Sequence, residues 1–88
     1  MKNKRVRKLV AMLYTLDRLI RERIYCFCIS RNLYTELEDS YSKKEQRGAE
    51  RRYEDLVIIT DKLITKIRTH IVENGGDALY EQAKEIFC

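Results

Sequence analysis

The feature that most constrains this chain is a seven-residue apolar repeat. Apolar or aromatic residues recur at strict heptad spacing at Val6, Leu13, Ile20, Phe27, Tyr34 and Tyr41. The matching second position of the heptad holds Leu9, Leu16 and Leu37. This pattern is typical of a helix that packs one face against other helices. It predicts a helix over about residues 3–39, with a bend or break near "ISRN" because Arg23 and Ser30 interrupt the second position.

A polar stretch follows this repeat and predicts a turn over about residues 40–48. Ser42 followed by Glu45 fits a capping box, and Gly48 comes soon after. The next segment, about 49–73, carries one apolar face and is predicted to be a second helix.

The sequence "ENGGD" predicts the end of the second helix. Asn74 or Gly75 can take the left-handed conformation that terminates a helix. Asp77 is a suitable N-cap for a short third helix over about residues 78–87.

These elements predict an all-α fold, a helical hairpin with a short third helix, in one domain over residues 1–88. The absence of proline supports this prediction, since nothing interrupts the helical hydrogen-bond ladder. A hairpin of two amphipathic helices leaves its outer seams uncovered, so we expect two chains to associate as a dimeric bundle. The expected core or dimer seam comprises Val6, Leu13, Ile20, Phe27, Tyr34, Leu63 and Ile67.

The N-terminus has a basic start followed by "LVAMLY", which resembles the beginning of a signal peptide. Asp17 and Arg18 break the apolar run, and no segment approaches the roughly 20 apolar residues that span a bilayer. We therefore expect a soluble cytoplasmic protein whose cysteines are reduced.

Two cysteines lie one residue apart in "IYCFCIS", which raises the question of a metal site. At 100° per residue, Cys26 and Cys28 are 200° apart on a helix and cannot bind one ion together. The sequence predicts Cys28 as a small buried side chain beside the seam, and Cys26 on the opposite side. No metal and no cofactor are expected.

Positive charge is concentrated in the first 31 residues, which hold nine Lys or Arg against two acidic residues, 9 − 2 = +7, so that the rest is −3. Helical geometry places a basic stripe with interleaved tyrosines opposite the seam. Its residues, the expected partner-binding residues, are Lys4, Arg7, Tyr14, Arg18, Arg21 and Tyr25. Tyr and Arg dominate protein–protein contacts, and they also hold phosphates and stack on bases. A protein partner, a nucleic acid, an anionic membrane surface and a plain solvated face all stay open.

Asp17 falls within the apolar arc of the first helix and is expected to need a cationic partner. Lys66, Arg68 or His70 on the second helix can supply one. A buried pair of this kind more often fixes the register of two helices than takes part in catalysis.

Two resemblances of form bear on function. A long helix, a second helix and a short third one resemble the all-helical chorismate mutases, and "LDRLIRER" and "AERRYEDL" resemble that family's arginine-bearing segments. The lysine that the family would place after Arg23 is missing, and the third helix is too short to complete such a pocket. The helical-hairpin dimers that control plasmid copy number bind RNA through one exposed face, and "DALYEQAKEIF" resembles their chain end.

No nucleophile–base set, paired-carboxylate motif or metal signature appears, and the only histidine, His70, lies on an apolar arc. The sequence therefore predicts a non-catalytic interaction or regulatory protein, an inhibitor or adaptor of the kind that phages and mobile elements carry. A nucleic-acid-binding dimer is the alternative, and a chorismate-mutase-like enzyme is a distant third.

Overall fold

Helix α1 (Lys4–Ser30) begins at an asparagine that caps it. In the computed structural model, which describes residues 3–33 and 41–87, Asn3 Oδ1 accepts hydrogen bonds from the backbone N–H groups of Arg5 (3.1 Å) and Val6 (3.3 Å). An N-cap asparagine satisfies donors that the first helical turn leaves without partners. The predicted start of this helix is thus explained by its cap.

Helix α1 ends at Ser30, before the predicted bound of about residue 39. Asn32 has a left-handed backbone (φ 55°), and its N–H donates to the carbonyl of Ile29 at 3.0 Å. The N–H of Leu33 donates to the carbonyl of Cys28 at 2.8 Å, which completes a Schellman motif. The helix stops within the "ISRN" segment. Residues 34–40 lie outside the described residues, and with them Tyr34 and Leu37 of the predicted seam.

Helix α2 (Lys43–Glu73) starts at the predicted capping box. Ser42 Oγ accepts from the N–H of Glu45 at 3.1 Å, and Glu45 Oε1 accepts from the N–H of Ser42 at 2.9 Å. The hydrogen bonds to Ser42 hold the pKa of Glu45 below its ordinary value. The helix therefore begins at Lys43 rather than near residue 49, because the capping box is its first turn and not part of the preceding turn.

Helix α2 ends where the glycines were expected to end it. Gly75 and Gly76 have positive φ angles of 127° and 60°, and the N–H of Gly76 donates to the carbonyl of Ile71 at 2.7 Å. Helix α3 (Asp77–Phe87) follows at once. Its N-cap position is held by Gly76, whose carbonyl accepts from the N–H of Tyr80 at 3.2 Å, so Asp77 is its first helical residue and not its cap.

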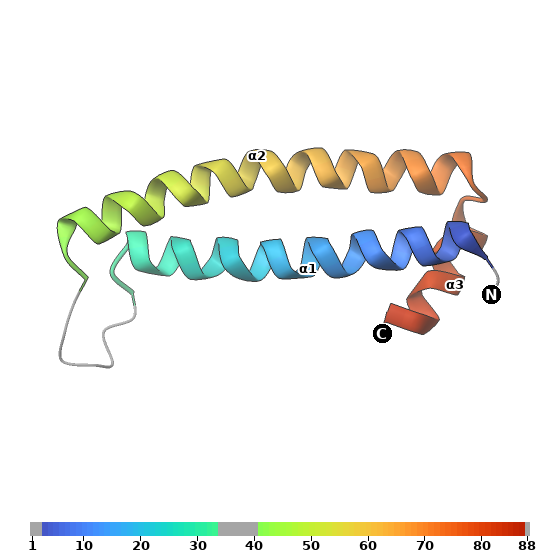
Figure 1. Ribbon diagram of the computed structural model, residues 1–88, viewed down its shortest axis with the longest axis horizontal. Helices are drawn as coiled ribbons and strands as arrows, with labels where there is room; N and C mark the ends of the chain where they lie inside the picture. Colours follow the sequence, from blue (N-terminus) through green and yellow to red (C-terminus); the bar gives the residue numbers. More distant parts are fainter. Residues whose placement is uncertain (1–2, 34–40, 88) are drawn as a thin grey trace. The chain divides into compact units, whose positions relative to one another are not determined.

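The all-α prediction is confirmed: the three helices account for the regular structure of residues 3–33 and 41–87 (Figure 1). Over that same part of the chain, no helix is both long and apolar enough to cross a membrane. The chain divides into two compact units. Unit 1 comprises Met1–Arg18 and Asp61–Cys88, and unit 2 comprises Leu19–Thr60.

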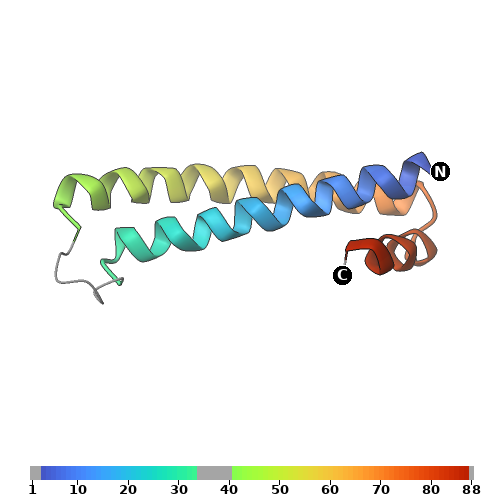
Figure 2. The same ribbon diagram turned by 60° about the horizontal axis from the view of Figure 1, so that its bottom comes forward.

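Unit 1 is built from the first part of α1, the second part of α2 and all of α3 (Figure 2). Its core is a single apolar cluster of Val6, Leu9, Ile67, Leu79 and Ala83, of which Leu9 and Ala83 are completely buried. The predicted seam residues Leu13 and Leu63 pack against this cluster while partly buried. Leu79 and Ala83 lie four residues apart on α3, which explains how a helix of 11 residues stays docked.

Unit 2 pairs the second part of α1 with the first part of α2. Successive contacts join Arg23 to Thr60 and Phe27 to Tyr53, so the two segments run antiparallel. The buried residues are Leu56, Thr60 and Cys26. Beyond the end of α1, Asn32 Oδ1 accepts a hydrogen bond of 3.0 Å from the N–H of Tyr41.

The heptad seam of α1 becomes more exposed along the helix. Val6 is 5% exposed, whereas Ile20 and Phe27 are 37% and 38% exposed. In unit 1 this stripe packs on Leu79 and Ala83 of α3. In unit 2, Phe27 lies about 100° around α1 from the buried Cys26 and is therefore at the margin of the face that packs on α2.

Candidate functional site

The basic stripe predicted on α1 is accessible at each of its positions. Lys4, Arg7 and Arg18 are exposed in unit 1, and Arg21 is exposed in unit 2. Tyr14 in unit 1 and Tyr25 in unit 2 are each 54% exposed. Tyrosines with half their surface in solvent and arginines beside them offer rigid aromatic area and charged donors to a partner.

Tyr14 also helps to hold α3. Its ring lies 4.8 Å from the ring of Phe87, centroid to centroid, with an interplanar angle of 57°. Tilted aromatic pairs at this separation are favourable beyond the area they bury. Tyr14 therefore contacts α3 through Phe87 while about half of its surface stays exposed.

Unit 2 contains a polar layer that the sequence analysis noted only as an interruption of the seam. Arg23 Nη1 donates to Thr60 Oγ1 at 2.9 Å, and the Arg23 guanidinium lies 5.8 Å from the centre of the Tyr53 ring. The Thr60 hydroxyl is fully buried and donates to the carbonyl of Leu56 at 2.8 Å. Because this buried hydroxyl both accepts and donates a hydrogen bond, its burial does not leave a polar group without a partner.

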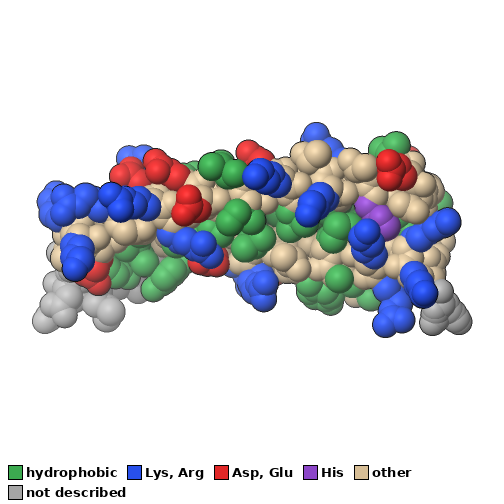
Figure 3. Space-filling model, turned by 45° about the horizontal axis from the view of Figure 1, so that its top comes forward, with side chains coloured by type: hydrophobic (Ala, Val, Ile, Leu, Met, Phe, Trp, Pro, Cys, Tyr) green, Lys and Arg blue, Asp and Glu red, His purple; other side chains and the backbone are tan. Residues whose placement is uncertain are grey.

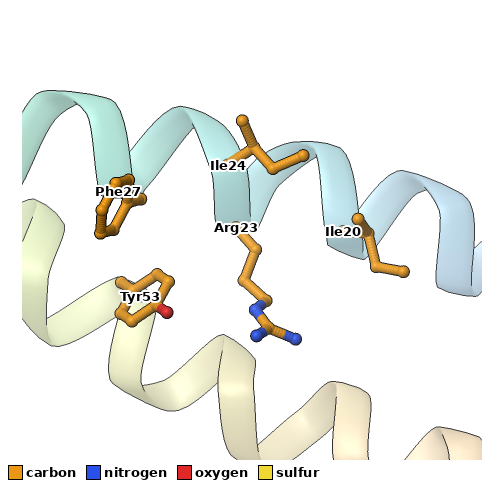
Figure 4. Close-up of a pocket in the computed structure, with 5 residues that line it drawn as sticks. All are labelled: Ile20, Arg23, Ile24, Phe27 and Tyr53. Atoms are coloured by element: carbon orange, nitrogen blue, oxygen red, sulfur yellow. The ribbon is translucent and has the colours of Figure 1, made fainter. Parts of the chain in front are cut away.

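A pocket of about 380 Å³ opens beside this polar layer (Figure 4). Its walls are apolar or aromatic, and Arg23 is its one charged residue among the described lining residues. The lining residues are Ile20, Arg23, Ile24, Phe27 and Tyr53. The sequence analysis did not predict this pocket. The signal that points to it is an arginine at a seam position where leucine is expected.

A second hollow, of about 560 Å³, lies in unit 1 between α1 and the last turns of α2. Figure 3 shows the face on which the histidine, in purple, lies near Lys or Arg side chains. Its described lining residues are Lys8, Met12, Leu63, Thr65, Lys66, Thr69, His70 and Glu73. Two lysines and one carboxylate are among these lining residues, together with the apolar Met12 and Leu63.

Both ring nitrogens of His70 lie within hydrogen-bond distance of polar groups. Asn74 Nδ2 donates to the carbonyl of His70 at 2.8 Å and is 3.2 Å from His70 Nδ1, so Nδ1 accepts. Nε2 therefore carries the proton and donates to the carbonyl of Arg5 at 2.9 Å. His70 thus ties α2 to the backbone of α1. It does not fill the role of a partner for Asp17, which is half-buried.

The prediction of which of the two cysteines is buried is wrong. Cys26 is the buried one, at 7% exposed, and Cys28 is only partly buried. The packed face of α1 in unit 2 includes Arg23 and Cys26, which are three residues apart, whereas Cys28 lies 200° away from Cys26. Burial raises the pKa of the Cys26 thiol, with the Glu22 carboxylate as a smaller cause.

This raised pKa predicts slow alkylation of Cys26. Because the thiolate is the reactive form, a thiol with a raised pKa reacts less at any given pH below that pKa. We expect Cys26 to be modified by iodoacetamide at least about fivefold more slowly than Cys28 at pH 8, because burial also limits access. The labelling rate of Cys26 should keep rising above pH 9.0, its ordinary pKa. Peptide mass spectrometry measures both rates, and equal rates in the folded protein would contradict the burial of Cys26.

Within residues 3–33 and 41–87, no three His, Cys, Asp or Glu side chains gather as metal ligands would. Comparison of the chain with protein-family models, with curated proteins and with solved structures gives no match. The functional argument therefore depends on the surfaces of the two units alone.

Proposed function

We propose that this protein is a small, non-catalytic interaction module. It forms a dimeric helical bundle and binds a larger protein through the Arg/Tyr stripe of α1, acting as an inhibitor or adaptor. The observation that supports this proposal best is the exposure of all six stripe residues, with Tyr14 and Tyr25 each 54% exposed. Half-exposed tyrosines beside arginines are the residue types that contribute most to protein–protein binding energy.

The chemistry of the described polar groups supports a binding role over a catalytic one. Both ring nitrogens of His70 are engaged, with Arg5 and with Asn74. Cys26 is buried, and its pKa is raised, so its thiol is a poor nucleophile. A general base or an activated nucleophile needs an accessible group with a pKa near the working pH.

The test is affinity capture with a double charge reversal, Arg18→Glu with Arg21→Glu. Tagged wild-type and variant proteins are incubated with nuclease-treated lysate of the natural host, and bound proteins are identified by mass spectrometry. We expect the variant to bind the specific partner about a thousandfold more weakly, since two hot-spot arginines at about 2 kcal/mol each contribute about 4 kcal/mol. Arg47→Glu with Arg51→Glu, two exposed positions on α2 with the same change in net charge, should leave capture intact.

A nucleic-acid partner gives a different result. If the stripe binds RNA or DNA, labelled oligonucleotides bind the wild type with an affinity that falls steeply with salt, about one unit of log–log slope for each phosphate contact. That result, or a captured protein equally retained by the stripe variant, would overturn binding of a protein through this face.

A further inference from the structure

The whole net charge of the protein lies in unit 1. That unit has ten Lys or Arg and six Asp or Glu, 10 − 6 = +4, whereas unit 2 has eight of each. A positively charged domain attracts anions, and a hollow in its surface concentrates that attraction. The hollow of about 560 Å³ between α1 and α2 belongs to this unit.

Two lysines border this hollow from different helices, Lys8 from α1 and Lys66 from α2. The two helices run antiparallel in unit 1 (Figures 1 and 2). The ring of His70 contacts the carbonyl of Arg5 at 2.9 Å, so these two residues lie at about the same height. Lys8 lies three residues beyond Arg5. Lys66 lies four residues before His70, so the two lysines are level to within about one residue's rise of 1.5 Å.

The charges of both lysines are available to a ligand. Lys8 and Lys66 are exposed, and within residues 3–33 and 41–87 neither forms an ion pair. Glu73, the one carboxylate among the described lining residues, lies seven residues beyond Lys66, about 10 Å along α2. Two ammonium groups at one height, with that carboxylate a whole two turns away, attract the same anion. A dianion satisfies both charges at once.

The end of the hollow opposite Glu73 is apolar. Met12 lies four residues beyond Lys8, and Leu63 lies three residues before Lys66, so both are about 5 Å along the helices from the lysines. Met12 and Leu63 are half-buried and pack against the core of unit 1, which holds them in place. Ligand sites combine apolar walls with a few charged groups, and their volumes are about 300–1,000 Å³.

We propose that the hollow of unit 1 binds a small phosphomonoester. Its phosphate lies between Lys8 and Lys66, and an apolar or aromatic group attached to it lies on Met12 and Leu63. A phosphomonoester carries close to two negative charges at pH 7 and has three acceptor oxygens, so it can pair with both lysines. The proposed function uses the Arg/Tyr stripe and none of these four residues, so a test of one site leaves the other proposal untouched.

The test titrates phenyl phosphate into the ¹⁵N-labelled full chain and follows the backbone amides by NMR. The largest shifts should occur at Lys8, Lys66 and Thr69, which also borders the hollow. Phenyl phosphate should bind about tenfold more tightly than inorganic phosphate, because its ring buries apolar surface. Benzyl alcohol, which has the ring without the charge, should give no saturable shift. Absence of shifts at both lysines with phenyl phosphate would overturn the proposal.

Single lysine substitutions test the charged part of the site. Lys8→Gln and Lys66→Gln should each weaken phenyl phosphate binding about tenfold, since each removes one charge-assisted hydrogen bond. Lys84→Gln is the matched control, because Lys84 is an exposed lysine of unit 1 that does not border the hollow. It should leave the dissociation constant within about twofold of wild type. Equal weakening by all three changes would show attraction by net charge alone and refute the site.

Met12→Gln tests the apolar part. It should remove the tenfold preference for phenyl phosphate over inorganic phosphate and leave the binding of inorganic phosphate within about twofold of wild type. A preference that persists in the folded variant would contradict the placement of the ring. Because Met12 packs partly against the core, circular dichroism first establishes that the variant folds. The exposed lysine variants decide the proposal if it does not.

A lipid can present the same phosphate group. Co-sedimentation with phosphatidylcholine vesicles that contain phosphatidic acid distinguishes the two sources. Vesicle binding that Lys66→Gln weakens would assign the phosphomonoester to a lipid headgroup. No vesicle binding, with phenyl phosphate still bound, would assign it to a soluble molecule.

Discussion

Leu9→Ala should lower the free energy of unfolding by about 3 kcal/mol. Leu9 is completely buried in the cluster of unit 1, where Ile67 of α2 and Leu79 of α3 also lie. Truncation removes the transfer free energy of its side chain and leaves a cavity that well-packed neighbours fill only in part. Because domains of this kind are stable by about 5–15 kcal/mol, the loss is a large fraction of the total. Urea denaturation followed by circular dichroism measures it.

Val72→Ala is the matched control for this change. Val72 is 78% exposed on α2, so its truncation should alter the free energy of unfolding by no more than about 0.5 kcal/mol. The placement of the core would be refuted if the two variants lost similar stability. Both proteins should be compared at one concentration, since dimerisation would add to the apparent stability of each.

Ala83→Glu should release α3 from unit 1. Ala83 is completely buried against the cluster that contains Val6 and Leu9, and it leaves no room or polar partner for a carboxylate there. Burial of an unpaired charge costs several kcal/mol, more than one docked helix gains. A detached helix of 11 residues is too short to persist in water. The α3 amides should therefore exchange hydrogen at least about a hundredfold faster than in the wild type.

Gln82→Glu supplies the control, because it adds the same charge at the neighbouring, exposed position. It should leave the exchange of the α3 amides within about threefold of wild type. Equal protection of α3 in the Ala83→Glu protein would show that the helix is held by other contacts, for example by the Tyr14–Phe87 ring pair.

The sequence predicted the helices more accurately than it predicted which faces they bury. Local signals were sufficient for the capping box at Ser42 and for the glycine end of α2, because each depends on hydrogen bonds within a few residues. The end of α1 was predicted too far along the chain. The heptad pattern continues past Asn32, whereas the helix ends just before this left-handed residue.

The burial of individual side chains depends on neighbours that are distant in sequence. A strict heptad indicates a seam, but it does not show which helices cover it, so Ile20 and Phe27 were predicted on a packed face and are more than a third exposed. Cys26 is buried in place of Cys28 because the side of α1 that packs on α2 in unit 2 holds Arg23 and Cys26. The pocket beside Tyr53 could not be predicted without the register of α1 against α2, because that register is set by contacts between residues far apart in the sequence.

The polar layer of Arg23 and Thr60 favours one register of α1 against α2 in unit 2 over registers that are shifted by one turn. A slip of α2 by one turn would bring Leu56 or Leu63, on the same side of α2, to the level of the guanidinium, and neither offers an acceptor. Leucine contacts alone vary little in energy between such registers. A sequence redesigned with leucine at both positions would therefore resist denaturant better and yet lose the single alignment that shapes the surface beside it.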